Sequence, residues 1–170
     1  AKAKERARRT KCLSNLRQTR IGFAAWSEDN GGVWPWQVST NQGGTKELIS
    51  KGRAADHFLA LSYYQKSARV LFCPADPARQ SANNYSNFGN SNLSYFLGLD
   101  AITNSGLAVL TGDRHLQLNR QPVTPGLLVV SNRAAFGWTK ELHARTFQSA
   151  VGNLSFADGH VDHVRATRLS

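Results

Sequence analysis

The stretch NLSFADGHVDHV, residues 153–164, places four side chains that can bind metals or transfer protons within six positions. They are Asp158, His160, Asp162 and His163. Carboxylates and imidazoles are the ligands of many metal sites and the acids and bases of many hydrolases. The same stretch also fits a β-hairpin, because Asp-Gly is a favoured pair of turn residues. The two interpretations predict different functions, and the rest of the chain has to distinguish them.

A hairpin centred on Asp158 and Gly159 predicts a two-residue type I′ turn, in which both positions take positive φ. Four cross-strand pairs follow from such a turn: Ala157 with His160, Phe156 with Val161, Ser155 with Asp162, and Leu154 with His163. The apolar pair of this set would lie on one face of the hairpin, beside the leucine. We therefore expect an amphipathic hairpin near the C-terminus.

The alternation of side chains along a strand also bears on the metal interpretation. It places His160 and Asp162 on one face of the hairpin and His163 on the other. Three ligands cannot converge on one ion from opposite faces. A metal site would need further ligands from elsewhere in the chain, for example Asp113 and His115. The sequence thus favours the hairpin and leaves a metal-dependent hydrolase as a remote alternative.

The N-terminal segment, residues 1–29, predicts the longest helix, since it contains no proline and no glycine before Gly22. From residue 12 onward, apolar and small residues recur at helical spacing: Cys12, Leu16, Thr19, Phe23 and Trp26. Before residue 12 nearly every residue is charged or alanine, so this part has no buried face. We expect a stalk whose second half packs on a domain and whose residues 1–10 have no partner there. A frayed basic terminus is the alternative.

The composition describes a globular protein of 170 residues with a net charge of +10. Eight of the 21 basic residues lie in residues 1–20 beside a single acid, so the excess is not spread over a folded face. This distribution argues against nucleic-acid binding. No run of about 18 apolar residues is present that could span a membrane.

Residues 1–18, AKAKERARRTKCLSNLRQ, closely resemble the segment just after the hydrophobic N-terminal helix of pseudopilin-like proteins. These are type II secretion or type IV pilin-like proteins whose N-terminus is cleaved and methylated. Further similarity to that family occurs, in the same order, at residues 30–35, 71–74, 94–100 and 154–161. The last of these is similar to a C-terminal signature in which Asp-Gly turns the final hairpin. Many family members carry a histidine ten residues before that aspartate, where this chain has Gln148.

The resemblance implies an α+β, pilin-like fold, with a stalk helix at residues 1–29 packed on a small antiparallel sheet in a globular domain, residues 30–170. It implies a structural subunit of a secretion filament that performs no catalysis and needs no cofactor. An upstream apolar helix would anchor the chain on the periplasmic side of the inner membrane or in a cell-surface filament. Its partners would be other pseudopilin subunits and secretion-machinery proteins. Some pseudopilins bind calcium near the C-terminus, and Asp158 and Asp162 are the candidate ligands here.

The body of the chain predicts helices at residues 45–51 and 54–64, with strands at 69–73, 93–97, 107–111 and 127–131. Helices come first and strands follow, an order that favours an antiparallel sheet. Cys12 would face the core from the helix, and Cys73 ends a predicted strand. Two buried free thiols are one interpretation of this pair. The resemblance to exported proteins favours a disulfide instead.

The tryptophans offer a second function. Trp34 and Trp36 flank a proline and either form a stacking platform for sugars or cover the end of the helix, and we favour cover. With Trp138, a platform would indicate a secreted β-rich module that binds a carbohydrate or another ligand. No nucleophile elbow and no phosphate-binding glycine-rich loop is present.

Overall fold

The computed structural model describes residues 2–101, 108–124, 126–127, 136–139, 143 and 151–165. It opens with one long helix, α1 (Lys2–Asp29). Short helical segments follow: η1 (Pro35–Gln37), η2 (Thr40–Gln42), η3 (Lys46–Lys51), α2 (Ala54–Phe58), η4 (Leu59–Ser62), η5 (Ala68–Leu71) and η6 (Asn90–Asn92). The strands come last: β1 (Tyr95–Leu97), β2 (Val109–Asp113), β3 (Leu116–Leu118), β4 (Gln121–Pro122), β5 (Phe136–Trp138), β6 (Val151–Phe156) and β7 (Val161–Arg165).

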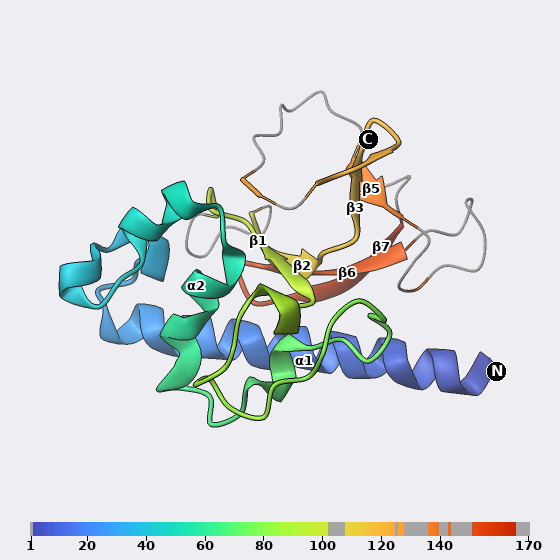
Figure 1. The fold of residues 1–170 in the computed structure, drawn as a ribbon, viewed down its shortest axis with the longest axis horizontal. Helices are drawn as coiled ribbons and strands as arrows, with labels where there is room; N and C mark the ends of the chain where they lie inside the picture. The colour runs from blue at the N-terminus through green and yellow to red at the C-terminus, as the bar shows by residue number, and fades with distance from the viewer. Residues whose placement is uncertain are drawn as a thin grey trace.

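The strands form two antiparallel sheets, one in the order β1-β2-β6-β7 and the other in the order β4-β3-β5. Helix α1 packs against one face of the larger sheet, through β2, β6 and β7, and the smaller sheet lies on the opposite side (Figure 1). Figure 1 also shows the N-terminal end of α1 reaching past the ends of β6 and β7. The expected α+β class with an antiparallel sheet is confirmed.

Helix α1 is held by the stripe that the sequence predicts. Its positions Cys12, Leu16, Thr19, Phe23 and Trp26 are all buried. Among these, Phe23 makes the central contacts, edge-on to the rings of Trp36 and Phe58 with centroids 5.4 Å and 5.3 Å away. These contacts tie the helix to the segments that follow it in the chain.

The helix ends where two glycines permit a left-handed turn. Gly31 and Gly32 have φ of 74° and 82°, and the amide of Gly32 donates to the carbonyl of Ser27. The side-chain amide of Asn30 donates to the carbonyl of Trp26, another group left open at the helix end. The predicted boundary near residue 29 is confirmed.

Five predicted elements differ from the structure. The strand expected at 69–73 is the 3-10 turn η5, because the Ser67 hydroxyl accepts a hydrogen bond from the amide of Arg69 and caps a helical turn. The helix expected at 54–64 divides into α2 and η4, and the one at 45–51 is the 3-10 helix η3. The strand expected at 107–111 runs instead over Val109–Asp113, and β1 starts two residues later than predicted.

The strand expected at 127–131 falls largely outside the described residues. The sequence did not indicate β3, β4 or β5. Among the helices that the structure describes, none combines the length and apolarity needed to cross a bilayer.

Candidate functional site

A disulfide joins α1 to the segment after η5. Cys12 and Cys73 are bonded, with their Cα atoms 5.2 Å apart, and neither side chain is exposed to solvent. The predicted pairing is therefore present. The bond lies on the docked face of α1, one turn before Leu16, and fixes the helix to the body across 61 residues of chain.

Two ionisable side chains lie directly beside this disulfide. The Nε2 atom of His143 is 3.7 Å from the sulfur of Cys73 and 3.5 Å from Oδ2 of Asp113, the last residue of β2. Both side chains are buried. Cys12, Cys73 and His143 are also the one group of three metal-ligating residues that lie within 4.8 Å of one another in the described part of the chain.

The Asp113 carboxylate is positioned by the neighbouring strand β6. Its Oδ2 accepts hydrogen bonds from the backbone amide of Asn153 at 2.8 Å and from the Asn153 side chain at 3.1 Å. Its Oδ1 is buried and accepts no hydrogen bond from the residues that the structure describes. Burial raises the pKa of Asp113 to about 7, although the hydrogen bonds from Asn153 act in the opposite direction.

The network continues onto β7 through a cross-strand pair. Asn153 and His163 are opposite each other, and the Nδ1 of His163 lies 2.9 Å from the Oδ1 of Asn153. Burial, together with the nearby charge of Arg9, lowers the pKa of His163 to about 4. His163 is therefore neutral at physiological pH and acts as a hydrogen-bonding partner within the sheet.

The first turns of α1 contact the same cluster. Arg9 donates a hydrogen bond to the carbonyl of His143 at 2.8 Å, and the carboxylate of Glu5 lies 3.5 Å from the Nδ1 of that histidine. The expectation that residues 1–10 have no partner in the domain is wrong at these two positions. Glu5 and Arg9 lie at helical spacing before Cys12, on the same docked face of α1, but they are charged. Their partner His143 is 134 residues away from Arg9 along the chain.

A second buried ion pair stabilises the loop before β1. The guanidinium of Arg114 contacts both carboxylate oxygens of Asp76, at 2.7 Å and 2.8 Å. The Nε2 of His115 lies 3.5 Å from the same carboxylate. Burial opposes ionisation of Asp76, but the hydrogen bonds from His115 and Arg114 outweigh it and hold the pKa well below its usual range. Asp113 and His115 therefore belong to different clusters and do not join His160 in one site.

The C-terminal hairpin forms, but with a different turn from the predicted one. The amide of Phe156 donates to the carbonyl of His160, and the amide of Gly159 donates to the carbonyl of Phe156, which encloses a three-residue loop. Gly159 takes a positive φ of 108°. The arrangement matches the three-residue hairpin with a glycine bulge.

The longer loop shifts the pairing of the strands by one residue. Ser155 is opposite Val161, and Leu154 is opposite Asp162, so the four predicted pairs are wrong. The reason is tertiary: the amide of Ala157 donates to the carbonyl of Ala108 beside β2, which holds that residue out of the hairpin ladder. The predicted separation of His160 from His163 holds, because it depends on alternation within one strand only.

The side chains that suggested chemistry make local contacts around this turn. Asp158 accepts from the backbone amide of His160 at 3.1 Å and lies 2.6 Å from its Nδ1, while the His160 ring stacks on Phe156. The Oδ1 of Asp162 accepts from the amide of His163 at 2.7 Å. Asp158 and Asp162 are both exposed and belong to no group of three metal ligands within the described residues. Their calcium role stays a prediction.

The tryptophans of the expected platform are buried. Trp34, Trp36 and Trp138 are 1%, 2% and 1% exposed. The rings of Trp34 and Trp36 stack on each other at 5.8 Å, and the indole nitrogen of Trp36 donates to the carbonyl of Leu99. The prediction that Trp34 and Trp36 cover the end of the helix is confirmed, and the alternative of a surface stacking platform built from these rings is wrong.

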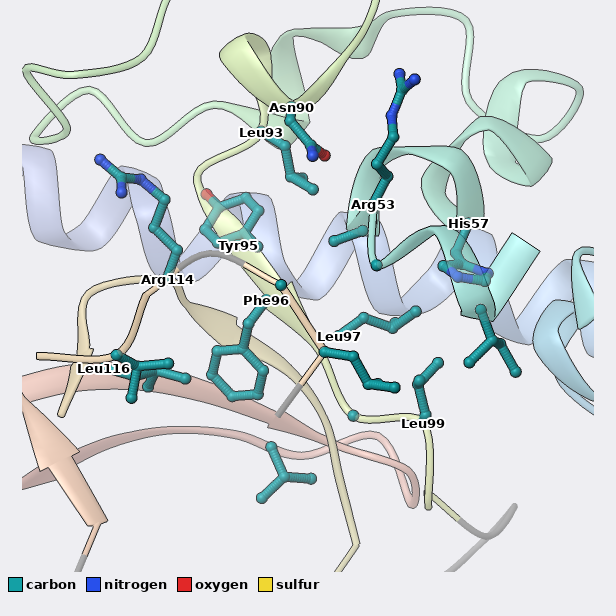
Figure 2. A pocket seen from close by; sticks show the side chains of 18 of the residues that line it. Arg53, His57, Asn90, Leu93, Tyr95, Phe96, Leu97, Leu99, Arg114 and Leu116 are labelled. Atoms are coloured by element: carbon teal, nitrogen blue, oxygen red, sulfur yellow. The ribbon is translucent and has the colours of Figure 1, made fainter. Parts of the chain in front are cut away.

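A pocket of about 570 Å³ lies between the short helices and the sheets. Its apolar lining includes Leu93, Phe96, Leu97, Leu99, Val109 and Leu116. In Figure 2, Arg53 and Arg114 stand on opposite sides of these apolar side chains. Arg114 is paired with Asp76 and Arg53 lies 3.5 Å from Asp56, whereas Arg79 has no carboxylate within salt-bridge distance among the described residues. No sequence pattern indicated this pocket, because its walls come from segments spread over residues 49–127.

Comparison with known proteins identifies no relative: no protein-family model, no curated protein and no solved structure matches the chain.

Proposed function

We propose that this chain is the globular part of a structural subunit in a type II secretion pseudopilus or type IV pilin-like filament. In this role it acts in protein secretion without catalysis. The observation that carries the proposal is the long N-terminal helix α1, which packs on an antiparallel sheet and extends past that sheet at its N-terminal end. The sequence resemblance of residues 1–18 to the corresponding segment of pseudopilins supports the same assignment.

The way α1 is attached to the body fits a subunit that is held in a filament through its N-terminal helix. The stripe of buried residues, the Cys12–Cys73 disulfide and the hydrogen bond from Arg9 to His143 join the helix to the body at successive turns. A subunit held in a filament by an apolar segment upstream of residue 1 would need this attachment, because the domain would otherwise pivot on its stalk. The basic side chains on the first turns would lie next to the lipid headgroups or to acidic residues of a neighbouring subunit.

The test uses the full-length gene product in its native cell. We expect a short basic leader followed by about 20 apolar residues upstream of residue 1, and a methylated N-terminus on the mature protein. Deleting the gene should retain secreted proteins in the periplasm, and the full-length gene should restore their release. A matched control exports residues 1–170 through an ordinary cleaved signal peptide, and it should not restore release. Restoration by this control, or a mature N-terminus produced by ordinary signal cleavage, contradicts the proposal.

We infer a second candidate function, ligand binding, from the pocket beside β1. Its volume lies within the range of small-molecule sites, and its lining combines apolar side chains with a few polar groups. Arg79 donates hydrogen bonds to the carbonyls of Leu93 and Ala78, and none of the described carboxylates lies within salt-bridge distance of it. The fitting ligand is a small organic anion with an apolar body.

Titration with anilinonaphthalene sulfonate, an anion of that kind, tests this function. We expect saturable fluorescence from the folded protein and at least about tenfold weaker binding after Arg79→Ala, the loss typical of one charged hydrogen bond. Arg17→Ala removes an exposed arginine of α1 and serves as the control with unchanged affinity. Equal affinity of the Arg79→Ala variant and the unmutated protein would remove the pocket from consideration.

A further inference from the structure

We propose that Cys12, Cys73, His143 and Asp113 form a zinc site in the reduced protein, so that either a disulfide or a metal ion can join α1 to the body. The proposal does not depend on the filament function. It concerns one buried cluster that draws its members from α1, the segment after η5, β2 and the region of residue 143.

Two of the distances between the ligand atoms match those of a tetrahedral zinc site. Bonds of about 2.3 Å to sulfur and about 2.0 Å to nitrogen or oxygen place neighbouring ligand atoms roughly 3.3–3.8 Å apart. The observed distances are 3.7 Å between Cys73 sulfur and His143 Nε2 and 3.5 Å between that nitrogen and Asp113 Oδ2. The ligand atoms of Cys12, Cys73 and His143 all lie within 4.8 Å of one another. To form the site, the two sulfurs have to separate from bonding distance to about 3.8 Å, and the Asp113 carboxylate, which is close to His143 but is not in the group within 4.8 Å, has to approach the sulfurs.

The charges in the cluster also favour a cation. The Asp113 carboxylate is fully buried, and its Oδ1 has no hydrogen-bond donor in the described part of the chain. A buried carboxylate is stable when it is paired with a positive charge or coordinates a metal. Zinc would neutralise two of the three negative charges of two thiolates and one carboxylate, and the opposite charges of Arg9 and Glu5, both beside His143, offset each other.

The residues that contact the proposed ligands are arranged as in known zinc centres. A histidine ligand commonly directs its second ring nitrogen to a carboxylate, and the Nδ1 of His143 lies 3.5 Å from Glu5. The carboxylate ligand is oriented by the backbone and the side chain of Asn153. Arg9 also supports the site, because it donates a hydrogen bond to the carbonyl of His143. Among the described residues of the first turns of α1, Glu5 and Arg9 are the ones shown to contact His143.

The change between the two states is an ordinary thiol–disulfide reaction. A cellular dithiol transfers two electrons and two protons to the Cys12–Cys73 bond, which becomes two thiols while the dithiol becomes a cyclic disulfide. Zinc then binds both sulfurs as thiolates and displaces two protons. In reoxidation, a cellular disulfide accepts the two electrons and takes up two protons to become a dithiol, while the Cys12–Cys73 bond re-forms and the ion is released. A chain that has not yet been oxidised can thus keep α1 in its native position.

The experiment compares oxidised and reduced protein under anaerobic conditions. Protein reduced with a phosphine should bind one zinc ion per chain by calorimetry, and the oxidised protein should bind none. Cobalt(II) added to the reduced protein should give sulfur-to-metal absorption in the near ultraviolet and the strong visible bands of a tetrahedral site. His143→Ala should weaken zinc binding at least tenfold, whereas His160→Ala, at an exposed histidine of the hairpin, should leave it unchanged.

Folding is controlled separately. Each variant is first checked in its oxidised form by circular dichroism, where a cooperative melt shows that it folds. If the reduced unmutated protein loses helix, zinc should restore the helical signal, and failure to restore it overturns the proposal. Absence of zinc binding by a folded reduced protein, zinc binding of equal strength by the oxidised protein, or undiminished binding by His143→Ala also overturns it.

Discussion

Breaking the Cys12–Cys73 disulfide should lower the stability of the protein by a predictable amount. The bond closes a loop with a sequence separation of 61 residues. The chain-entropy model assigns a loop of this length a stabilisation of about 4 kcal/mol, by restricting the unfolded chain. For a protein of this size about 1 kcal/mol corresponds to roughly 2–4 °C, so the melting temperature should fall by about 8–16 °C.

The assay is a thermal melt followed by circular dichroism, with and without a phosphine reductant. A chelator is included so that no metal replaces the bond. The Cys73→Ala variant has no disulfide to lose and is the matched control, in which the reductant should change nothing. A shift of less than about 2 °C in the unmutated protein would refute the reasoning, because the helix would then be held by packing alone. Two reactive thiols in denatured protein that has not been treated with a reductant would refute the disulfide itself.

Three further predictions concern the strands and their hairpin. Gly159→Val should destabilise the protein by more than about 1 kcal/mol, because the φ of Gly159 is 108°, whereas His160→Ala should change stability little. Urea denaturation of both variants measures the difference, and a larger loss of stability in His160→Ala would contradict the turn. Gly152→Ala should lower the free energy of unfolding by about 1–3 kcal/mol, since an added Cβ would come within 2.0 Å of the Trp138 ring. An unchanged denaturation midpoint would show that the two sheets are not packed as described. The folded-state pKa of His163 is about 4, below the unfolded value of about 6.5, so the stability of the protein should fall as pH drops from 6.5 towards 4. Thermal melts across that range should show a weaker pH dependence for His163→Gln. An equal dependence in both proteins would contradict the prediction.

Local patterns predicted the features that depend on neighbouring residues. The spacing of Cys12, Leu16, Thr19, Phe23 and Trp26 indicated the docked face of α1, and all five are buried. The helix expected at residues 1–29 is α1, which ends at Asp29. The Asp-Gly pair located the last hairpin but could not specify its register. Type I′ turns and three-residue loops with a glycine bulge both accept this pair. The choice between them comes from the hydrogen bond that Ala157 makes to Ala108.

Features that depend on distant residues had no local signal. Glu5 and Arg9 appeared solvated because their partner, His143, lies more than 130 residues away. Asp113 appeared as a possible ligand, but nothing nearby in the sequence indicated that Asn153 would hold it. The pocket likewise depends on how the short helices meet two sheets.

The most direct test of the filament account is electron cryomicroscopy of filaments sheared from cells that produce the full-length protein. The account predicts a helical assembly in which α1 continues inward to an apolar core at the filament axis, with the sheets on the outside. In the map, the side chains of the first turns of α1 should face a neighbouring subunit or lie close to the membrane end. Filaments that lack this chain, with the chain recovered only as free protein, would contradict the account.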